Sequence, residues 1–477
     1  MNTKIRTSKK DVIWSFIAQF FALGTGLITL PLVLSLLTAE EIGMNYLMMS
    51  VSTMVVLIDF GFAPQFGRNI TYVLAGSQEL QKEGISPSTG EINYTLLANM
   101  IGVARRVYRI LAIVSLTMML TGGTIYINHV TDGFTNVHNS LAIWIVYSVS
   151  IYFSVYYVYL NSLLSGRGLI KEARIATIVS RIAQIIMTVT FLLMGWGLLG
   201  LVISNFISPF VYRFIALRSF YDKEMRSNLA EACPTLAEQK RLFSIIWYNA
   251  RKLGLVFLGG YVITKFGMFI AGLFLSLTEI ASYGLMIQFV GIINGLASIF
   301  YMASNPMFSA LRSEGKSQEL LQRFSLTMSV YYVLYILGCS CLVLLGPYFL
   351  ALLKSNAILP STYIMVVYCI VILLENNHSN FATFIVTGNK IPFVESTLII
   401  GASICIGSFL ILKYTSLGIL GLVLVQGITQ LCYANWKWPY EVCREFHISF
   451  FRFLTIGFNE LLIRIPILTC QRRVLPS

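Results

Sequence analysis

Long apolar runs constrain this chain more than any other feature. They recur from end to end, each roughly 20 residues long, with short polar segments between them. A run of that length crosses a hydrocarbon layer of about 30 Å as an α-helix, whose backbone groups are satisfied internally, whereas an open sheet edge could not be satisfied in lipid. Because 56% of the 477 residues are apolar and only 12% are charged, a soluble class is excluded. We therefore predict an all-α integral membrane protein.

Twelve transmembrane helices are expected from these runs and their polar breaks. The predicted spans cover residues 12–37, 44–66, 107–128, 140–164, 172–194, 197–217, 252–275, 280–310, 325–352, 361–387, 394–413 and 417–438.

The basic residues test this order of spans, because cytoplasmic loops carry an excess of Lys and Arg. The N-terminus, the even-numbered connections and the C-terminal tail hold almost all of the 34 basic residues, whereas the odd-numbered connections hold only Lys354 and Lys413. Both termini are therefore predicted to be cytoplasmic. The net charge of +13 is interpreted as an orientation signal, so no nucleic-acid partner is predicted.

Short sequence matches indicate an internal repeat. The segment EIGMNYLM at 41–48 aligns with EIASYGLM at 279–286, and GLLGLV at 197–202 aligns with GILGLV at 418–423. The matches keep their order in both halves, and each half begins on the cytoplasmic side. We therefore expect two six-helix bundles related by a pseudo-two-fold axis along the membrane normal, with a cavity between them.

Domain boundaries follow from the repeat. We expect an N-terminal six-helix bundle at 1–218, a cytoplasmic linker loop at 219–246, a C-terminal six-helix bundle at 247–440 and a cytoplasmic tail at 441–477. The apolar segment 448–468 suggests a thirteenth span, but it contains Arg452, Glu460 and Arg464. We interpret it as an amphipathic helix at the membrane interface.

Cysteine and histidine give no sign of a metal or cofactor site. The eight cysteines are scattered, most of them inside apolar runs, and the four histidines form no metal-binding pattern. We interpret the cysteines as small packing residues, and we predict neither a metal nor a cofactor.

Several short motifs, together with the double repeat, are similar to those of a known superfamily. They are the basic start Lys9-Lys10-Asp11, the turn at 36–43, the stretch Asp59-Phe60-Gly61-Phe62 followed by Arg68, the Gly166-Arg167 turn, and the Gly-x-x-Gly-Leu entry to the sixth span. In these features the chain resembles the polysaccharide-transport branch of the multidrug, oligosaccharidyl-lipid and polysaccharide exporter superfamily. The closest resemblance is to the bacterial flippases of O-antigen repeat units.

That resemblance implies transport rather than catalysis. Such a flippase turns an undecaprenyl-diphosphate-linked oligosaccharide, an O-antigen or capsule repeat unit, from the cytoplasmic to the periplasmic leaflet of the bacterial inner membrane by alternating access. Its expected partners are this cargo and the membrane lipids, and a polysaccharide polymerase and a chain-length regulator are further candidates. No nucleotide-binding motif is found, so the energy would come from an ion gradient or from removal of the cargo.

Two other functions stay open at this point. A cation-coupled multidrug exporter of the same fold would use acidic residues to bind cations, whereas the seventh span has Lys265 at its midpoint. A membrane glycosyltransferase or polymerase would place catalytic residues in a sizeable periplasmic loop, whereas the longest outer connection, 129–139, is short and lacks Lys, Arg and Glu.

Charged residues inside the spans are the first candidate site residues, because each costs roughly 2.5 to 3.5 kcal/mol at a helix centre. Lys265 and Glu375 lie near the midpoints of the seventh and tenth spans, Arg181 about two turns inside the fifth, and Asp59 in the cytoplasmic third of the second. Lys265 and Arg181 are candidates to bind a diphosphate in the cavity. The alternatives are a structural ion pair with Asp59 or Glu375, or, for Arg181, snorkelling. Arg68 is a further candidate cavity residue.

A polar run interrupts the tenth span. Glu375, Asn376, Asn377, His378, Ser379 and Asn380 are consecutive, so on a helix they face every direction. Either the run borders water and sugar hydroxyls, or it is locally unwound and held by neighbouring helices. We expect Glu375, Asn376, Asn377, His378 and Asn380 to handle substrate, or Glu375 to take up a proton in each cycle. The alternative is an interhelical hydrogen-bond network.

Tyrosines and arginines near the fourth and third spans complete the candidates. Tyr152, Tyr156 and Tyr159 share one face of a helix, where they could stack on sugar rings or simply pack against other helices. Arg105, with Arg106 and Arg109, is interpreted first as an orientation signal, and the alternative is a role in gathering an anionic lipid head.

Overall fold

A computed structural model describes residues 28–82, 90–387 and 392–464. Its regular elements are helices, and no strand occurs within these ranges. Ten of the described helical segments are long and apolar enough to cross a membrane. The prediction of an all-α membrane protein is therefore confirmed.

The chain divides into two compact units, each held together by the packing of its own helices. The first contains Met1–Ala281 and Leu353–Ala357, and the second contains Ser282–Leu352 and Ile358–Ser477. The helix of the predicted seventh span therefore groups with the first unit, whereas the repeat places it in the second half of the sequence. Each unit is described by itself below.

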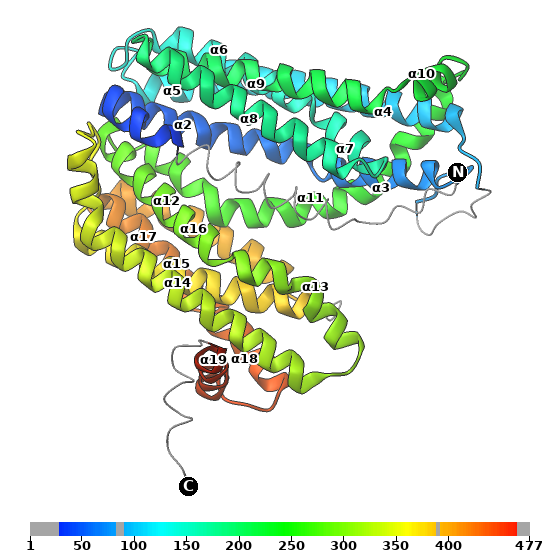
Figure 1. The fold of residues 1–477 in the computed structure, drawn as a ribbon. Helices are drawn as coiled ribbons and strands as arrows, with labels where there is room; N and C mark the ends of the chain where they lie inside the picture. The colour runs from blue at the N-terminus through cyan, green and yellow to red at the C-terminus, as the bar shows by residue number, and fades with distance from the viewer. Residues whose placement is uncertain (1–27, 83–89, 388–391, 465–477) are drawn as a thin grey trace. The chain divides into compact units, whose positions relative to one another are not determined.

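The first unit is built from the helices that follow a helical segment at 28–36. Its helices are α2 (Ala39–Val56), the short η1 (Leu57–Asp59), α3 (Phe62–Leu74), α4 (Tyr94–Met118), the π-helical η2 (Met119–Gly123), α5 (Thr124–Val130), α6 (Ser140–Tyr156), α7 (Val158–Gly166), α8 (Ile170–Leu193), α9 (Gly197–Phe220), α10 (Lys223–Ala230) and α11 (Leu236–Gly272). Helix α9 packs against both α6 and α8, α3 packs against α7, and α11 packs against α2, α3 and α4 (Figure 1).

The helix of the second span is broken where the motif Asp59-Phe60-Gly61 occurs. Phe60 and Gly61 have φ angles of 45° and 78°, so two consecutive residues adopt the left-handed conformation and the chain changes direction before α3. The Asp59 carboxylate accepts a hydrogen bond from the Ala63 N–H at 3.3 Å, which satisfies one of the free donors at the start of α3.

The second unit contains the remaining helices. They are α12 (Leu277–Ala297), whose first residues belong to the first unit, α13 (Ile299–Ser313), α14 (Ser317–Leu352), α15 (Thr362–Val386), α16 (Val394–Tyr414), α17 (Gly418–Leu431), α18 (Ala434–Glu445) and α19 (Phe450–Arg464). Helix α15 packs against α14, α17 and α18, and α16 packs against α17.

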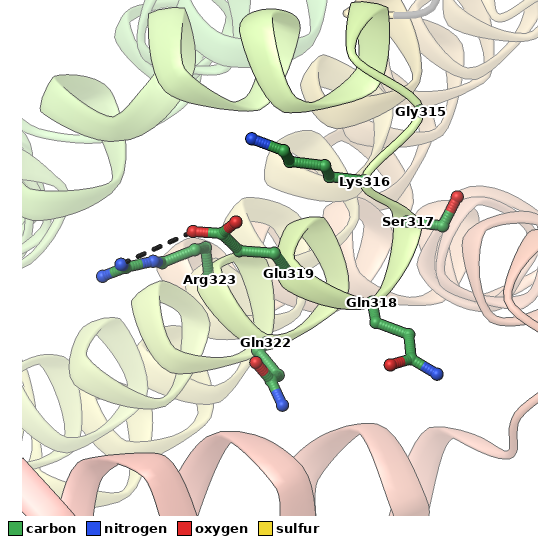
Figure 2. Close-up of a pocket in the computed structure, with 7 residues that line it drawn as sticks. All are labelled: Gly315, Lys316, Ser317, Gln318, Glu319, Gln322 and Arg323. Carbon is green, nitrogen blue, oxygen red and sulfur yellow. Dashed lines mark ion pairs between the residues drawn. The ribbon is translucent and has the colours of Figure 1, made fainter.

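A hollow of about 630 Å³ lies at the turn between α13 and α14 (Figure 2). Its charges come in pairs, because Lys316 lies 2.7 Å from Glu314 and Arg323 lies 3.7 Å from Glu319. The residues that line it include none of the candidates from the sequence. We therefore assign it no role in the site.

The two halves share details that the repeat predicts. Thr38 and Glu41 cap the start of α2 reciprocally: the Glu41 N–H donates to the Thr38 hydroxyl at 3.2 Å, and the Thr38 N–H donates to the Glu41 carboxylate at 3.0 Å. Ser276 and Glu279 make the same pair of bonds at the start of α12, at 3.3 and 2.9 Å. The matching residues of the repeat therefore perform matching structural tasks.

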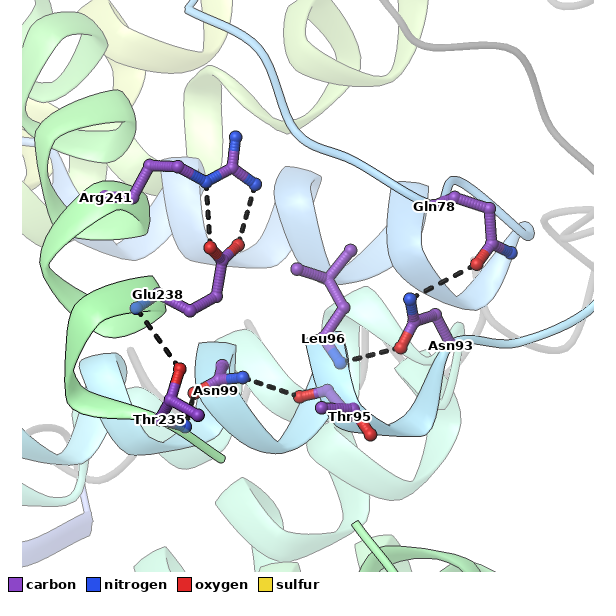
Figure 3. Close-up of polar contacts among 8 residues, drawn as sticks. All are labelled: Gln78, Asn93, Thr95, Leu96, Asn99, Thr235, Glu238 and Arg241. Carbon is purple, nitrogen blue, oxygen red and sulfur yellow. Dashed lines mark hydrogen bonds and ion pairs between the residues drawn. The ribbon is translucent and has the colours of Figure 1, made fainter. Parts of the chain in front are cut away.

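Polar caps fix the long helix α11 to α4 (Figure 3). The Thr235 hydroxyl accepts the Glu238 N–H at 3.4 Å at the start of α11, and the Thr235 N–H donates to the Asn99 side chain of α4 at 2.9 Å. Asn93 caps α4 in the same way, through the Leu96 N–H at 2.9 Å. These contacts explain why α11 groups with the first unit.

Helix α19 packs along α14 in the second unit. Phe453 is fully buried beside Phe324 and Phe381, and Gly457 lies so close to α14 that a Cβ atom there would clash with the Ser325 carbonyl oxygen. The predicted interfacial location of this segment stays a prediction.

Candidate functional site: a polar network and uncompensated arginines

Glu375 links two helices of the second unit. Its carboxylate accepts hydrogen bonds from the side-chain amides of Gln426 at 2.5 Å and Gln430 at 2.9 Å, both on α17. Tyr283, Tyr331 and Tyr368 also lie close enough to interact electrostatically with this carboxylate. Glu375 is therefore a half-buried acid surrounded by neutral hydrogen-bonding groups.

The other polar residues of the run contact four further helices, and α15 stays helical throughout. Asn376 accepts from Asn294 of α12 at 3.0 Å, and Asn377 accepts from the Tyr332 hydroxyl of α14 at 2.5 Å. His378 Nδ1 lies 2.7 Å from the Asn435 amide oxygen of α18, and the Asn380 carbonyl accepts from the Tyr301 hydroxyl of α13 at 2.7 Å. Of the two arrangements considered for this run, local unwinding is not found, and the neighbouring helices hold an intact helix.

The network also contains unused hydrogen-bonding capacity. Three of its buried atoms have no partner within the described structure, namely Asn380 Nδ2, Gln430 Oε1 and Asn435 Nδ2. Leaving a buried polar atom unpaired costs about 1 to 3 kcal/mol, so groups of this kind often serve a polar ligand. A purely structural network would be expected to satisfy itself more fully. The run is therefore suited both to joining helices and to binding a polar species.

Arg181 is exposed on α8 and has no carboxylate partner within the described ranges. Its Nη1 donates to the Gln184 side chain at 2.8 Å, and the Gln184 amide in turn donates to Asn205 of α9. The alternative of an ion pair with Asp59 is not found, and an ion pair with Glu375 stays a prediction. Arg181 thus retains its charge and most of its hydrogen-bond donors.

Asp59 and Arg68 each have a side-chain hydrogen-bond partner. The Tyr108 hydroxyl of α4 donates to Asp59, which also caps α3 as described above. Arg68 is exposed on α3, and its guanidinium donates to the Gln65 side chain. The structure therefore gives Asp59 a structural task, and it does not bring Asp59 or Arg68 into contact with Arg181.

Tyrosines of the fourth span form a ladder. The ring centroids of Tyr152 and Tyr156 lie 6.3 Å apart with an angle of 23° between the rings, and those of Tyr156 and Tyr159 lie 5.8 Å apart at 52°. The shared face predicted from their spacing is thus present, although the helix breaks at Tyr157.

For Lys265 the structure describes the backbone only. Its backbone lies in α11, but its side chain is outside the described part of the structure. Its role in the site stays a prediction. No group of three or more His, Cys, Asp or Glu residues suited to a metal ion occurs among the described residues.

Other basic residues are neutralised by carboxylates. Arg167 lies 2.5 Å from Asp222, and Arg241 forms a two-pronged pair with Glu238 at 2.7 and 2.9 Å. The Met225 backbone N–H and the Arg167 guanidinium hold the pKa of Asp222 below its usual value, and Arg241 does the same to the pKa of Glu238. Arg167 directly follows α7 and Asp222 precedes α10, whereas Glu238 and Arg241 lie in the first turns of α11.

Comparison with known proteins now identifies the family. Residues 8–312 match the family described as polysaccharide biosynthesis protein, which covers more than half of the chain. The chain belongs to this family. It is part of the multidrug, oligosaccharidyl-lipid and polysaccharide exporter superfamily, so the membership predicted from the sequence is confirmed. Comparison with curated protein sequences gives no match.

This chain shares its fold with solved membrane transporters. The lipid II flippase MurJ in an inward closed conformation is 14% identical, with 98% of this chain and 94% of that chain covered and a TM-score of 0.63. A multidrug resistance MATE family transporter in an inward-facing conformation is 15% identical, with 91% and 98% covered and a TM-score of 0.62. These likenesses show the fold, which has twelve transmembrane helices in two lobes. The predicted fold class is thereby confirmed.

Two features of the site could not be inferred from the sequence. The partners of the polar run, such as Gln426 and Gln430, lie 51 and 55 residues away in sequence from Glu375, and no local pattern marks them as partners. The contrast between paired and unpaired arginines is also invisible in the sequence, because it depends on which helices meet.

Proposed function

We propose that this protein is a flippase that moves an undecaprenyl-diphosphate-linked oligosaccharide, an O-antigen or capsule repeat unit, from the cytoplasmic to the periplasmic leaflet. The observation that carries the proposal is the match to a polysaccharide biosynthesis family in a chain that consists of membrane-crossing helices. A membrane protein of this composition serves polysaccharide synthesis most directly by carrying a lipid-linked intermediate. The lipid II flippase among its structural neighbours also handles a lipid-linked cargo.

The charges of the first unit suit such a cargo. Arg68 and Arg181 have side-chain amides as partners instead of carboxylates, so their guanidinium groups stay available to a diphosphate. We propose that Arg181 and Lys265 bind the diphosphate during alternating access, while the polyprenyl tail stays in lipid. Tyr152 and Tyr156 then offer aromatic faces to the sugars.

Glu375 is the proposed proton-handling group of the second unit. Protonation would convert its two charge-assisted hydrogen bonds with Gln426 and Gln430 into weaker neutral ones. The contact between α15 and α17 would therefore loosen when a proton binds. This gives a proton gradient a way to act on the carrier.

Location and orientation are part of the same proposal. The protein would lie in the bacterial inner membrane with both termini in the cytoplasm, as the distribution of basic residues indicates. A polysaccharide polymerase and a chain-length regulator would then act on the cargo after it has crossed.

Surface glycan tests this proposal. A strain that lacks the protein should lose its surface polysaccharide, and the wild-type gene should restore it. Arg181→Ala and Lys265→Ala should fail to restore it at normal protein levels in the membrane. Normal surface glycan with both variants would reject the role of these cations, and normal glycan in the deletion strain would reject the function.

A multidrug exporter is the second candidate, because the half-buried acid Glu375 could also couple cation movement to drug export in a protein with this fold. Drug susceptibility separates the two functions. If the protein is an exporter, the deletion strain should be sensitive to drugs and have normal surface glycan. If it is a flippase, the deletion strain should lose surface glycan and keep normal drug resistance.

A further inference from the structure

Arg105 differs from the paired arginines of the first unit. Arg167 and Arg241 have carboxylate partners at 2.5 and 2.7 Å. Arg105 instead donates from Nη2 to the Tyr221 hydroxyl at 2.7 Å, and the Tyr159 hydroxyl lies close enough to interact electrostatically with its guanidinium. No carboxylate of the described chain acts as its electrostatic partner. The charge of Arg105 is therefore held in place but not neutralised.

Three separate elements bring this cluster together. Arg105 lies on α4, Tyr159 on α7, and Tyr221 directly after α9. Arg105 is exposed, Tyr221 is half-buried and Tyr159 is 5% exposed. The Tyr221 hydroxyl holds the guanidinium through one of its five N–H donors, so the remaining donors are available on the exposed side.

The tyrosine ladder begins at this cation. Tyr156 interacts electrostatically with Arg105, its ring lies 5.8 Å from that of Tyr159, and the ladder continues to Tyr152. Both Tyr152 and Tyr156 are half-buried, so part of each ring is open to a ligand. A fixed cation beside a row of aromatic faces fits a ligand in which a phosphate is joined to a sugar, because phosphate binds the guanidinium and the C–H face of a sugar packs on an aromatic ring.

We propose that Arg105, Tyr159 and Tyr221 form a binding site for the phosphate or diphosphate of a lipid-linked sugar, with the first sugar against Tyr156 and Tyr152. This inference rests on the proposed function and adds the place where the cargo is first held. The site lies toward the end of α4 that the charge pattern predicts to be cytoplasmic, where such a cargo would enter.

Phospholipid head groups share the phosphate chemistry, so the sugar must be tested separately. The full-length protein in phosphatidylcholine nanodiscs is titrated with three lipids: undecaprenyl diphosphate that carries a disaccharide, undecaprenyl diphosphate alone, and phosphatidylglycerol. The variants are Arg105→Gln, which removes the charge, and Tyr156→Leu, which removes the aromatic face. Arg241→Gln is the matched control, because Glu238 already occupies that guanidinium.

Arg105→Gln is expected to weaken binding of both diphosphate lipids by about tenfold to hundredfold, the range of one charge-assisted contact. Tyr156→Leu should weaken binding of the disaccharide lipid several-fold and leave the sugar-free lipid unaffected. Arg241→Gln should bind all three lipids as the wild type does. If Arg105→Gln does not reach the membrane, Tyr221→Phe replaces it, because loss of the hydroxyl releases the guanidinium and should weaken both diphosphate lipids.

Each other outcome overturns a defined part of the account. Wild-type affinity in folded Arg105→Gln overturns the site, while binding of the disaccharide lipid by the wild type leaves the proposed function intact. An equal loss for phosphatidylglycerol reassigns Arg105 to membrane head groups and overturns the sugar-phosphate assignment. A wild-type protein that binds no diphosphate lipid overturns both this inference and the proposed function.

Discussion

Replacing Glu375 by glutamine and by alanine separates its two roles, which are to join helices and to carry a charge. Both changes remove the carboxylate charge, so the difference between the variants isolates the contacts with Gln426 and Gln430. One amide oxygen of a glutamine can accept both donors, whereas alanine leaves both without a partner. Hydrogen bonds between membrane helices average about 0.6 kcal/mol, and those in proteins generally reach about 1.5 kcal/mol. The loss of two such bonds should make the free energy of unfolding of Glu375→Ala lower than that of Glu375→Gln by about 1 to 3 kcal/mol.

Stability and transport are measured on the same two variants. Reversible unfolding in bicelles gives the free-energy difference, and flipping of a labelled lipid-linked oligosaccharide in proteoliposomes gives the rate with and without a proton gradient. Glu375→Gln should fold and lose the response to the gradient, because its charge no longer changes. Equal stability of the two variants would refute the hydrogen-bond account, and a wild-type response to the gradient in Glu375→Gln would refute proton handling.

Three further predictions concern the scaffold. Asn99→Ala should destabilise the protein by about 1 kcal/mol in the same unfolding assay, because Asn99 anchors the cap at Thr235; a change near zero would mean that water replaces the bond. Gly457→Ala should release α19, because its Cβ would clash with the Ser325 carbonyl oxygen; hydrogen exchange of α19 should rise, and unchanged protection would contradict the close packing. The pKa of Asp222 is lowered in the folded state, so its stabilisation is present above the unfolded-state value of about 3.9 and is lost as the pH falls through the lower folded value. The difference in melting temperature between wild type and Asp222→Asn should therefore be small at pH 7 and should shrink as the pH falls through the folded-state pKa, and a difference that grows in acid would contradict it.

The sequence predicted the all-helical membrane class well, because the membrane imposes a length and an apolar composition on every span. It predicted helix starts less well. Helix α4 begins at Tyr94 and α11 at Leu236, both before the apolar runs that were expected from 107 and 252. Hydropathy detects only the part of a helix that lies in lipid, whereas the caps Asn93 and Thr235 decide where the helix begins.

The breaks within spans and the partners of polar residues were harder to predict. The left-handed pair Phe60-Gly61 was recognised as a motif but not as a break, since an apolar residue seldom adopts a positive φ angle. The polar run of α15 is visible in the sequence, because six polar residues cannot face lipid. Its partners on α12, α13, α14, α17 and α18 could not be derived, because they depend on how distant helices pack.

Flipping by the purified protein tests the central claim most directly. Proteoliposomes that contain only this protein are loaded with an undecaprenyl-diphosphate-linked oligosaccharide whose sugar is fluorescent, and an impermeant quencher reports the leaflet in which each sugar lies. The account predicts that the protected fraction becomes accessible at a rate that rises with the amount of protein and falls strongly in Arg181→Ala. A rate equal to that of protein-free vesicles, measured with correctly folded protein, would contradict the claim that this chain carries lipid-linked sugars across the membrane.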